Sequence, residues 1–114
     1  MRIALILALL AASAVAAPPS TCDLPGAYER ALCAYQHRNF SEAERAFRAI
    51  VAADEKIPET LHATYFLART LMKTGRYDEA APLLIRIYDL DPAFYSTWSC
   101  DYLLGECRKA QGKS

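Results

Sequence analysis

The feature that most constrains the fold of this chain is an internal repeat with a period of 37 residues. Tyr28, Tyr65 and Tyr102 follow one another at that interval. Other positions keep their chemical character between copies: Ala31, Ala68 and Gly105; Phe40 and Tyr77; Ala43 and Ala80; Phe47 and Leu84; Ile50 and Ile87; Gly75 and Gly112. A period of this length predicts stacked units, each of which buries its apolar face against the next.

Within each copy, apolar residues recur three and four positions apart, the spacing of one helix face. Alternating β-branched residues are absent, so the sequence predicts an all-α protein. Ser41 followed by Glu44 has the spacing of a capping box and is expected to begin the second helix. The other helices are expected to begin near residue 26, to span 59–73 and 78–90, and to end near residue 111.

The first residues have the order of a secretory signal peptide. Arg2 precedes an unbroken apolar run over 3–10 and a small-residue segment over 11–17. The apolar run is shorter than the roughly 20 residues that span a bilayer. We therefore expect a signal peptide at 1–16, an extended proline-containing leader at 17–25 and a helical repeat domain at 26–112. An exported protein, periplasmic or secreted, follows from this assignment.

The formal charge of the chain is balanced, with 13 basic and 13 acidic residues. Nucleic acids and anionic membranes attract proteins with a basic excess, so neither is an expected partner. Stable membrane insertion after signal cleavage is not expected either. A charge near zero favours weak self-association.

The segment from Leu61 to Pro92 resembles the tetratricopeptide repeat family. Its strongest match runs from Thr74 to Ala80 (TGRYDEA), with the loop glycine, the aromatic residue that opens the second helix and the alanine packed beneath it. A weaker copy precedes this unit, and an incomplete one follows from Tyr102, so the resemblance covers about residues 24–112. It implies an α-solenoid of antiparallel helix pairs, with about two units and a C-terminal capping helix.

In this family the first helices of the pairs line a concave face. The resemblance implies that a protein or peptide partner binds there, through Tyr28, Leu32, Tyr35, His62, Tyr65, Arg69, Met72, Tyr102 and Glu106. Tyrosine is frequent in binding surfaces because it offers apolar area and a hydroxyl with little side-chain entropy to lose. The alternative is that these rings only pack between neighbouring helices. An aromatic cluster near the last helix has the same two interpretations, of which core packing is favoured: Phe94, Tyr95, Trp98 and Tyr102.

Four cysteines in an exported chain suggest disulfides, with three possible pairings. Cys33 and Cys107 would lie on equivalent helices separated by an intervening one, at more than the roughly 7 Å limit between bonded Cα atoms. Both pairings that join the two ends of the array are therefore unfavourable. The predicted bonds are Cys22–Cys33 and Cys100–Cys107. The second requires the last helix to begin after Cys100, since seven residues of continuous helix span about 10.5 Å.

No catalytic set is expected. The chain lacks the C-x-x-C spacing of thiol exchange, and neither His37 nor His62 has a cysteine or histidine at zinc-ligand spacing, so no metal and no cofactor are predicted. The predicted function is a non-catalytic protein-interaction module, such as a scaffold or assembly factor. The alternatives are an inhibitor or immunity-type protein that binds a secreted enzyme and, less favoured, a thiol-redox protein using Cys33 with His37.

Overall fold

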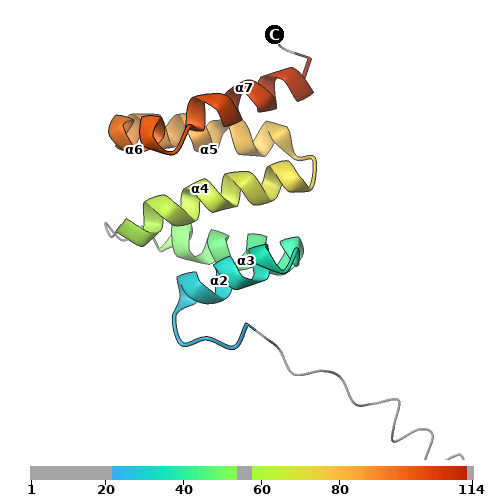
Figure 1. Cartoon of the computed structure of the whole chain (residues 1–114), viewed down its shortest axis with the longest axis vertical. Helices are drawn as coiled ribbons and strands as arrows, with labels where there is room; N and C mark the ends of the chain where they lie inside the picture. Colours follow the sequence, from blue (N-terminus) through green and yellow to red (C-terminus); the bar gives the residue numbers. More distant parts are fainter. Residues whose placement is uncertain (1–21, 54–57, 113–114) are drawn as a thin grey trace, which may run out of the picture.

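The computed structural model describes residues 22–53 and 58–112 (Figure 1). These two ranges contain six helices and no strand, which confirms the predicted all-α class. The helices are α2 (Ala27–Gln36), α3 (Phe40–Ala52), α4 (Pro58–Lys73), α5 (Tyr77–Leu90), α6 (Pro92–Thr97) and α7 (Cys100–Ala110). None of these described helices is long and apolar enough to cross a membrane. The predicted signal peptide and the first part of the predicted leader lie outside the described residues.

The helices form antiparallel pairs that stack in chain order (Figure 1). The first pair is α2 with α3, and the second is α4 with α5. Since α4 packs against both α3 and α5, it joins the two pairs into one array. Beyond them, α7 packs on α5 in the position of the first helix of a third pair, and the short α6 connects the two along the chain. The predicted solenoid of about two units and a capping helix is confirmed.

Small residues occupy the places where helices cross closely. Four alanines at repeat-related positions are fully buried: Ala31, Ala43, Ala68 and Ala80. Gly105, the third residue in the series of Ala31 and Ala68, is exposed instead, and a Cβ added to it would meet no atom within 4 Å. The described part of the chain contains no second helix to cover α7 at this point.

The repeat extends to the backbone conformation of the turns. Arg38, Gly75 and Gly112 lie one period apart, after α2, α4 and α7, and have positive φ angles of 62°, 78° and 75°. A left-handed residue here ends the helix, because the next N–H can then bond a carbonyl five residues back. Two such bonds, each of 2.8 Å, join Asn39 N to Ala34 O and Arg76 N to Leu71 O.

Helix α3 begins one residue before Ser41, so the predicted capping box is wrong. The N-cap is Asn39, whose side-chain oxygen accepts a hydrogen bond from the backbone N–H of Glu42 at 3.4 Å. The reason lies in the preceding turn. Once Arg38 has ended α2 in a left-handed conformation, Asn39 is the residue placed to cap the next helix.

Helix α6 was not expected from the sequence. Asp91 and Pro92 do end α5, but they also begin a new helix. The Asp91 carboxylate accepts a hydrogen bond from Phe94 N at 3.0 Å, and Pro92 occupies the first helical position, where its missing N–H costs nothing. The same two residues therefore stop one helix and start another.

A ring of four charged side chains links the two helix pairs on the side of α3 and α5. Arg76 contacts Glu44 and Glu79 at 2.6 Å each, and Arg48 contacts the same two carboxylates at 2.9 and 3.2 Å. The hydrogen bond from Arg76 holds the pKa of Glu79 below its usual value. These groups are exposed to water, which screens them, so the ring stabilises the junction only modestly.

Candidate functional site

The residues predicted to bind a partner lie on α2, α4 and α7, but the structure divides them between two environments. Some pack in an aromatic layer between helices. Others line a hollow that remains open. The difference follows from α6, which lies next to α4 and places its own aromatic rings against it.

The aromatic layer is centred on Tyr65 of α4. Its ring is only 5% exposed and makes edge contacts with Trp98 at 5.0 Å, Phe66 at 5.1 Å and Phe94 at 6.2 Å between ring centroids. For Tyr65 this burial favours the packing interpretation over direct contact with a partner. Phe94 and Trp98 are half-buried and stack on each other, which agrees with the core packing favoured for their cluster. For Tyr102 of that cluster core packing is wrong, because its side chain is exposed.

His62 belongs to the same layer. Its ring lies 5.1 Å from both Phe94 and Trp98, and its Nδ1 is 2.9 Å from the carbonyl of Pro58. On the other side, the ring of Tyr28 from α2 meets His62 at 6.3 Å and Phe66 at 6.5 Å. The layer therefore runs from α2 across α4 to α6, and both His62 and Tyr28 are half-buried within it.

Arg69 connects the layer to the open part of the face. Its guanidinium carbon lies 5.9 Å from the ring centroid of Tyr35 on α2 and 5.7 Å from that of Tyr65 on α4. Its Nη1 also donates a hydrogen bond of 3.2 Å to the Tyr65 hydroxyl. Two aromatic faces and one hydroxyl thus fix the position of this cation.

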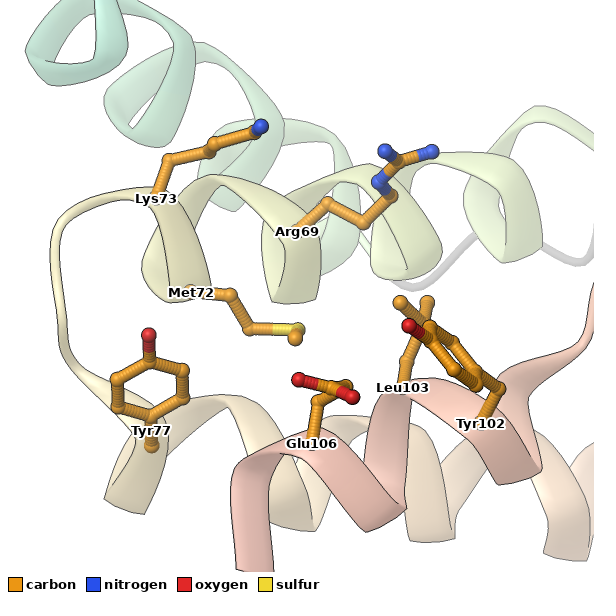
Figure 2. A pocket seen from close by; sticks show the side chains of 7 residues that line it. All are labelled: Arg69, Met72, Lys73, Tyr77, Tyr102, Leu103 and Glu106. Carbon is orange, nitrogen blue, oxygen red and sulfur yellow. The ribbon is translucent and has the colours of Figure 1, made fainter. Parts of the chain in front are cut away.

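A hollow of about 280 Å³ lies between α4 and α7, closed at one end by the start of α5 (Figure 2). Figure 2 shows Met72 and Glu106 pointing toward one another across it, with the Leu103 and Tyr102 side chains beside them. Seven residues line the hollow: Arg69, Met72, Lys73, Tyr77, Tyr102, Leu103 and Glu106. Four of them were predicted from the sequence, namely Arg69, Met72, Tyr102 and Glu106.

The structure adds Lys73, Tyr77 and Leu103 to the predicted set. Lys73 lies one helical turn after Arg69, and that spacing could have identified it. Tyr77 begins α5 and was predicted only as the aromatic residue that opens the second helix of the unit. The remaining predicted residues, Leu32 among them, do not line the hollow. Leu32 is half-buried on α2 and packs against the core.

Tyr102 is the most exposed large apolar residue at this site, with 66% of its surface accessible. It therefore differs from its repeat equivalents, since Tyr28 is half-buried and Tyr65 is buried. Burial raises the pKa of Tyr28, and the carboxylates of Glu29 and Glu59 raise it further, so its hydroxyl stays neutral. The three tyrosines share a register but not an environment.

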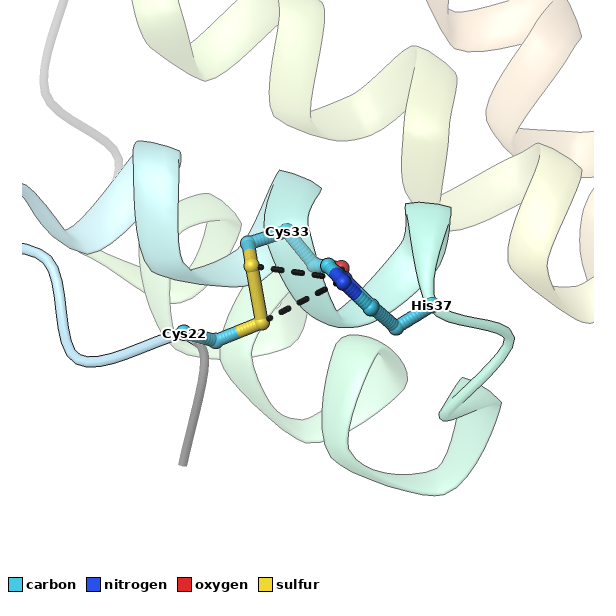
Figure 3. A group of neighbouring side chains, drawn as sticks. All are labelled: Cys22, Cys33 and His37. Carbon is cyan, nitrogen blue, oxygen red and sulfur yellow. Dashed lines mark hydrogen bonds between the residues drawn. A yellow bond between two sulfur atoms is a disulfide. The ribbon is translucent and has the colours of Figure 1, made fainter. Parts of the chain in front are cut away.

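One predicted disulfide is confirmed. Cys22 and Cys33 are bonded, with Cα atoms 5.5 Å apart, so the segment before α2 is fastened to that helix (Figure 3). His37, one helical turn after Cys33, lies beside the bond. The sequence predicted the Cys22–Cys33 bond and named Cys33 with His37 separately, but it did not show that all three side chains meet at one point.

The second predicted disulfide, Cys100–Cys107, is wrong. Both cysteines are buried free thiols on α7, which begins at Cys100 itself. A continuous helix holds residues seven positions apart at about 10.5 Å, beyond the reach of a disulfide. Burial, with a smaller contribution from Asp101, raises the pKa of Cys100 to about 11.

Stacked antiparallel helix pairs with small residues at their crossings and left-handed turns at their ends define a helical repeat protein. A family model described as Tetratricopeptide repeat matches residues 28–93, more than half of the chain, and the chain belongs to that family. Repeats of this family generally mediate protein–protein interaction and are typically non-catalytic. Searches of curated proteins and of solved structures found no match.

Proposed function

We propose that this protein is an exported, non-catalytic interaction module, a scaffold or assembly factor, that binds a protein partner at the hollow between α4 and α7. Three observations support the proposal. The family generally mediates protein–protein interaction. The N-terminal sequence has the order of a signal peptide. A disulfide joins Cys22 to Cys33, and such bonds persist in oxidising compartments outside the cytoplasm.

The observation that carries the proposed site is the position of Tyr102. Its exposed ring stands at the edge of the hollow, next to Leu103 and across from Met72 of α4 (Figure 2). Burying such a ring and the apolar side chains beside it contributes roughly 25 cal/mol for each Å² removed from water. The partner element that fits is a peptide segment with one apolar or aromatic side chain.

Charged residues at the hollow orient such a segment. Arg69 and Lys73 of α4 provide positive charge, while Glu106 of α7 provides negative charge. Figure 2 shows the two cationic groups directed away from α7 and the carboxylate directed toward α4. A segment that places a basic group in the hollow, near Glu106, and an acidic group beyond α4, where Arg69 and Lys73 point, matches this arrangement.

Site-specific photocrosslinking in the native host tests the site. A photoreactive phenylalanine analogue replaces Tyr102 in one variant and Tyr88 in the control. Tyr88 suits this purpose because its ring is 54% exposed and it does not line the hollow. The expected result is one recurrent crosslinked partner at position 102, absent at position 88. Equal products at both positions would contradict the site.

Capture of the crosslinked partner by two alanine variants then measures how much the Tyr102 ring contributes to binding. Tyr102→Ala is expected to weaken capture of that partner at least tenfold. Truncating an aromatic residue at the centre of an interface often costs about 2 kcal/mol of binding free energy. Tyr88→Ala should leave capture unchanged. Both variants should keep the helical circular dichroism of the parent protein, because neither ring is part of the buried core.

A further inference from the structure

Three potential metal ligands meet at the first helix, away from the hollow. They are Cys22 in the segment before α2, Cys33 on α2 and His37 directly after it (Figure 3). The Nδ1 of His37 lies 3.7 Å from the sulfur of Cys22 and 3.5 Å from that of Cys33. All three ligand atoms lie within 4.8 Å of one another.

We propose that, when the Cys22–Cys33 bond is reduced, these residues bind one Zn²⁺ ion through the two sulfurs and His37 Nδ1. Zinc binds thiolate at about 2.3 Å and imidazole at about 2.0 Å in a tetrahedral arrangement, which sets the sulfur–nitrogen edge at roughly 3.5 Å. The two sulfur–nitrogen distances already have this length. A water molecule completes the coordination in such three-ligand sites.

Only the sulfur–sulfur distance must change. The two sulfurs are bonded in the disulfide, whereas two thiolates on a tetrahedral zinc ion are roughly 3.8 Å apart. Cys33 and His37 are one turn apart at the end of the same helix, so their separation is fixed by α2. Cys22 lies in irregular chain before the helix and is partly exposed, so it can make the movement.

The reduction consumes a thiol compound. Two molecules of the thiol RSH give up two hydrogen atoms and become RSSR, while the Cys22–Cys33 bond breaks and each sulfur gains one hydrogen. Zn²⁺ then displaces the two thiol protons, because thiolate is the ligand form of cysteine. Disulfide and zinc are therefore mutually exclusive, and each fastens Cys22 to α2.

His37 can release its Nδ1 to the metal without leaving a polar group unsatisfied. In the disulfide form, Nδ1 lies 2.9 Å from the carbonyl oxygen of Cys33. That oxygen also accepts the backbone N–H of His37 at 3.0 Å. When Nδ1 binds the ion, the imidazole proton is on Nε2, and the carbonyl keeps the hydrogen bond from the His37 backbone.

Cobalt titration of the reduced chain tests the proposal, with Co²⁺ as a coloured substitute for Zn²⁺. All variants carry Cys100→Ser and Cys107→Ser, so that the only thiols are those of Cys22 and Cys33. The expected result is one equivalent of Co²⁺ per chain, with thiolate charge-transfer bands and the visible bands of tetrahedral cobalt. Added Zn²⁺ should remove both, and the oxidised protein should show neither.

His37→Ala, compared with His62→Ala, identifies the imidazole ligand. Losing one of three protein ligands should weaken binding at least tenfold in His37→Ala, whereas His62→Ala should bind as the parent does. Circular dichroism reports whether each variant is folded. If reduction lowers the helix content, its recovery on adding Zn²⁺ also supports the site. The proposal would be overturned if the reduced parent showed no cobalt bands, or if the two histidine variants bound Co²⁺ with equal affinity. A third variant, Cys22→Ser, should lose the bands, and their persistence would also overturn it.

Discussion

Arg38 and Gly75 stand one repeat apart and have nearly the same left-handed backbone, with φ angles of 62° and 78°. Glycine adopts this conformation at no steric cost, but for arginine it costs about 1 kcal/mol. The guanidinium of Arg38 lies over the Phe40 ring at 5.3 Å, a contact that offsets part of that cost. The first repeat thus performs with a strained residue the turn that the second performs with glycine.

Replacing Arg38 with glycine is therefore expected to stabilise the protein by about 0.5–1 kcal/mol, measured by urea denaturation. The matched variant is Gly75→Ala, which should destabilise it by about 1 kcal/mol because alanine must adopt the same left-handed conformation. If Arg38→Gly is less stable than the parent, the contact with Phe40 outweighs the backbone strain.

Tyr65 and Tyr102 occupy equivalent repeat positions but should respond differently to truncation. Tyr65→Ala is expected to cost about 3 kcal/mol of unfolding free energy, since it removes a buried ring that packs against Trp98 and Phe66. Tyr102→Ala should change it by less than about 0.5 kcal/mol, because that ring is exposed. Similar losses in both variants would show that the Tyr102 ring is packed in solution.

Because of the ring of charges between α3 and α5, the unfolding free energy of the protein should depend on pH. The folded protein holds the pKa of Glu79 below its ordinary value of 4.5, mainly through the hydrogen bond from Arg76. A depressed carboxyl pKa stabilises the folded state above the unfolded value, and that stabilisation disappears as the pH falls through the folded pKa.

Urea denaturation between pH 6 and pH 3 measures this effect. The parent protein should lose stability more steeply than Glu79→Gln as the pH falls below about 4.5. Because water reaches these groups, high salt should reduce the difference between the two proteins. Parallel pH profiles at low salt would mean that Glu79 makes no net contribution to stability.

The thiols of Cys100 and Cys107 should be present but unreactive in the folded protein. With a pKa of about 11, only roughly one Cys100 in a thousand is a thiolate at pH 8, and burial blocks the reagent further. Alkylation at pH 8 is expected to be slow in the native state and rapid in denaturant.

The count of thiols checks the same point. Denatured without reductant, the chain should show two thiols, and after reduction all four cysteines should react. If the denatured chain showed no thiols before reduction, Cys100 and Cys107 would be bonded to each other, contrary to this structure.

Much of the fold could be predicted because the repeat fixes both sequence pattern and packing. Small residues such as Ala31 and Ala68 mark close helix crossings, and Gly75 marks a turn, so spacing alone located the helix pairs. Helix α6 could not be predicted in the same way. It is too short to show an apolar periodicity, and Asp91 with Pro92 is a stop signal for the preceding helix as well as a start signal for this one.

The candidate site was only partly predictable. The repeat places Tyr65 and Tyr102 on one face, but it does not show that α6 covers the first and leaves the second open. Burial depends on contacts between helices, and no local pattern reports them. Around Cys33, the sequence indicated the bond to Cys22 and the neighbouring His37 separately, but no local spacing showed that the three side chains form one group.

The exposed Gly105 gives the molecule a surface on which further structure can be built. At the corresponding places in the first two units, Ala31 and Ala68 are covered by neighbouring helices, whereas around Gly105 there is room for a new Cβ and for a close backbone. An engineered helix joined after the left-handed Gly112 could lie across α7 as α3 lies across α2. The array is therefore modular, and protein engineers could lengthen it one helix at a time.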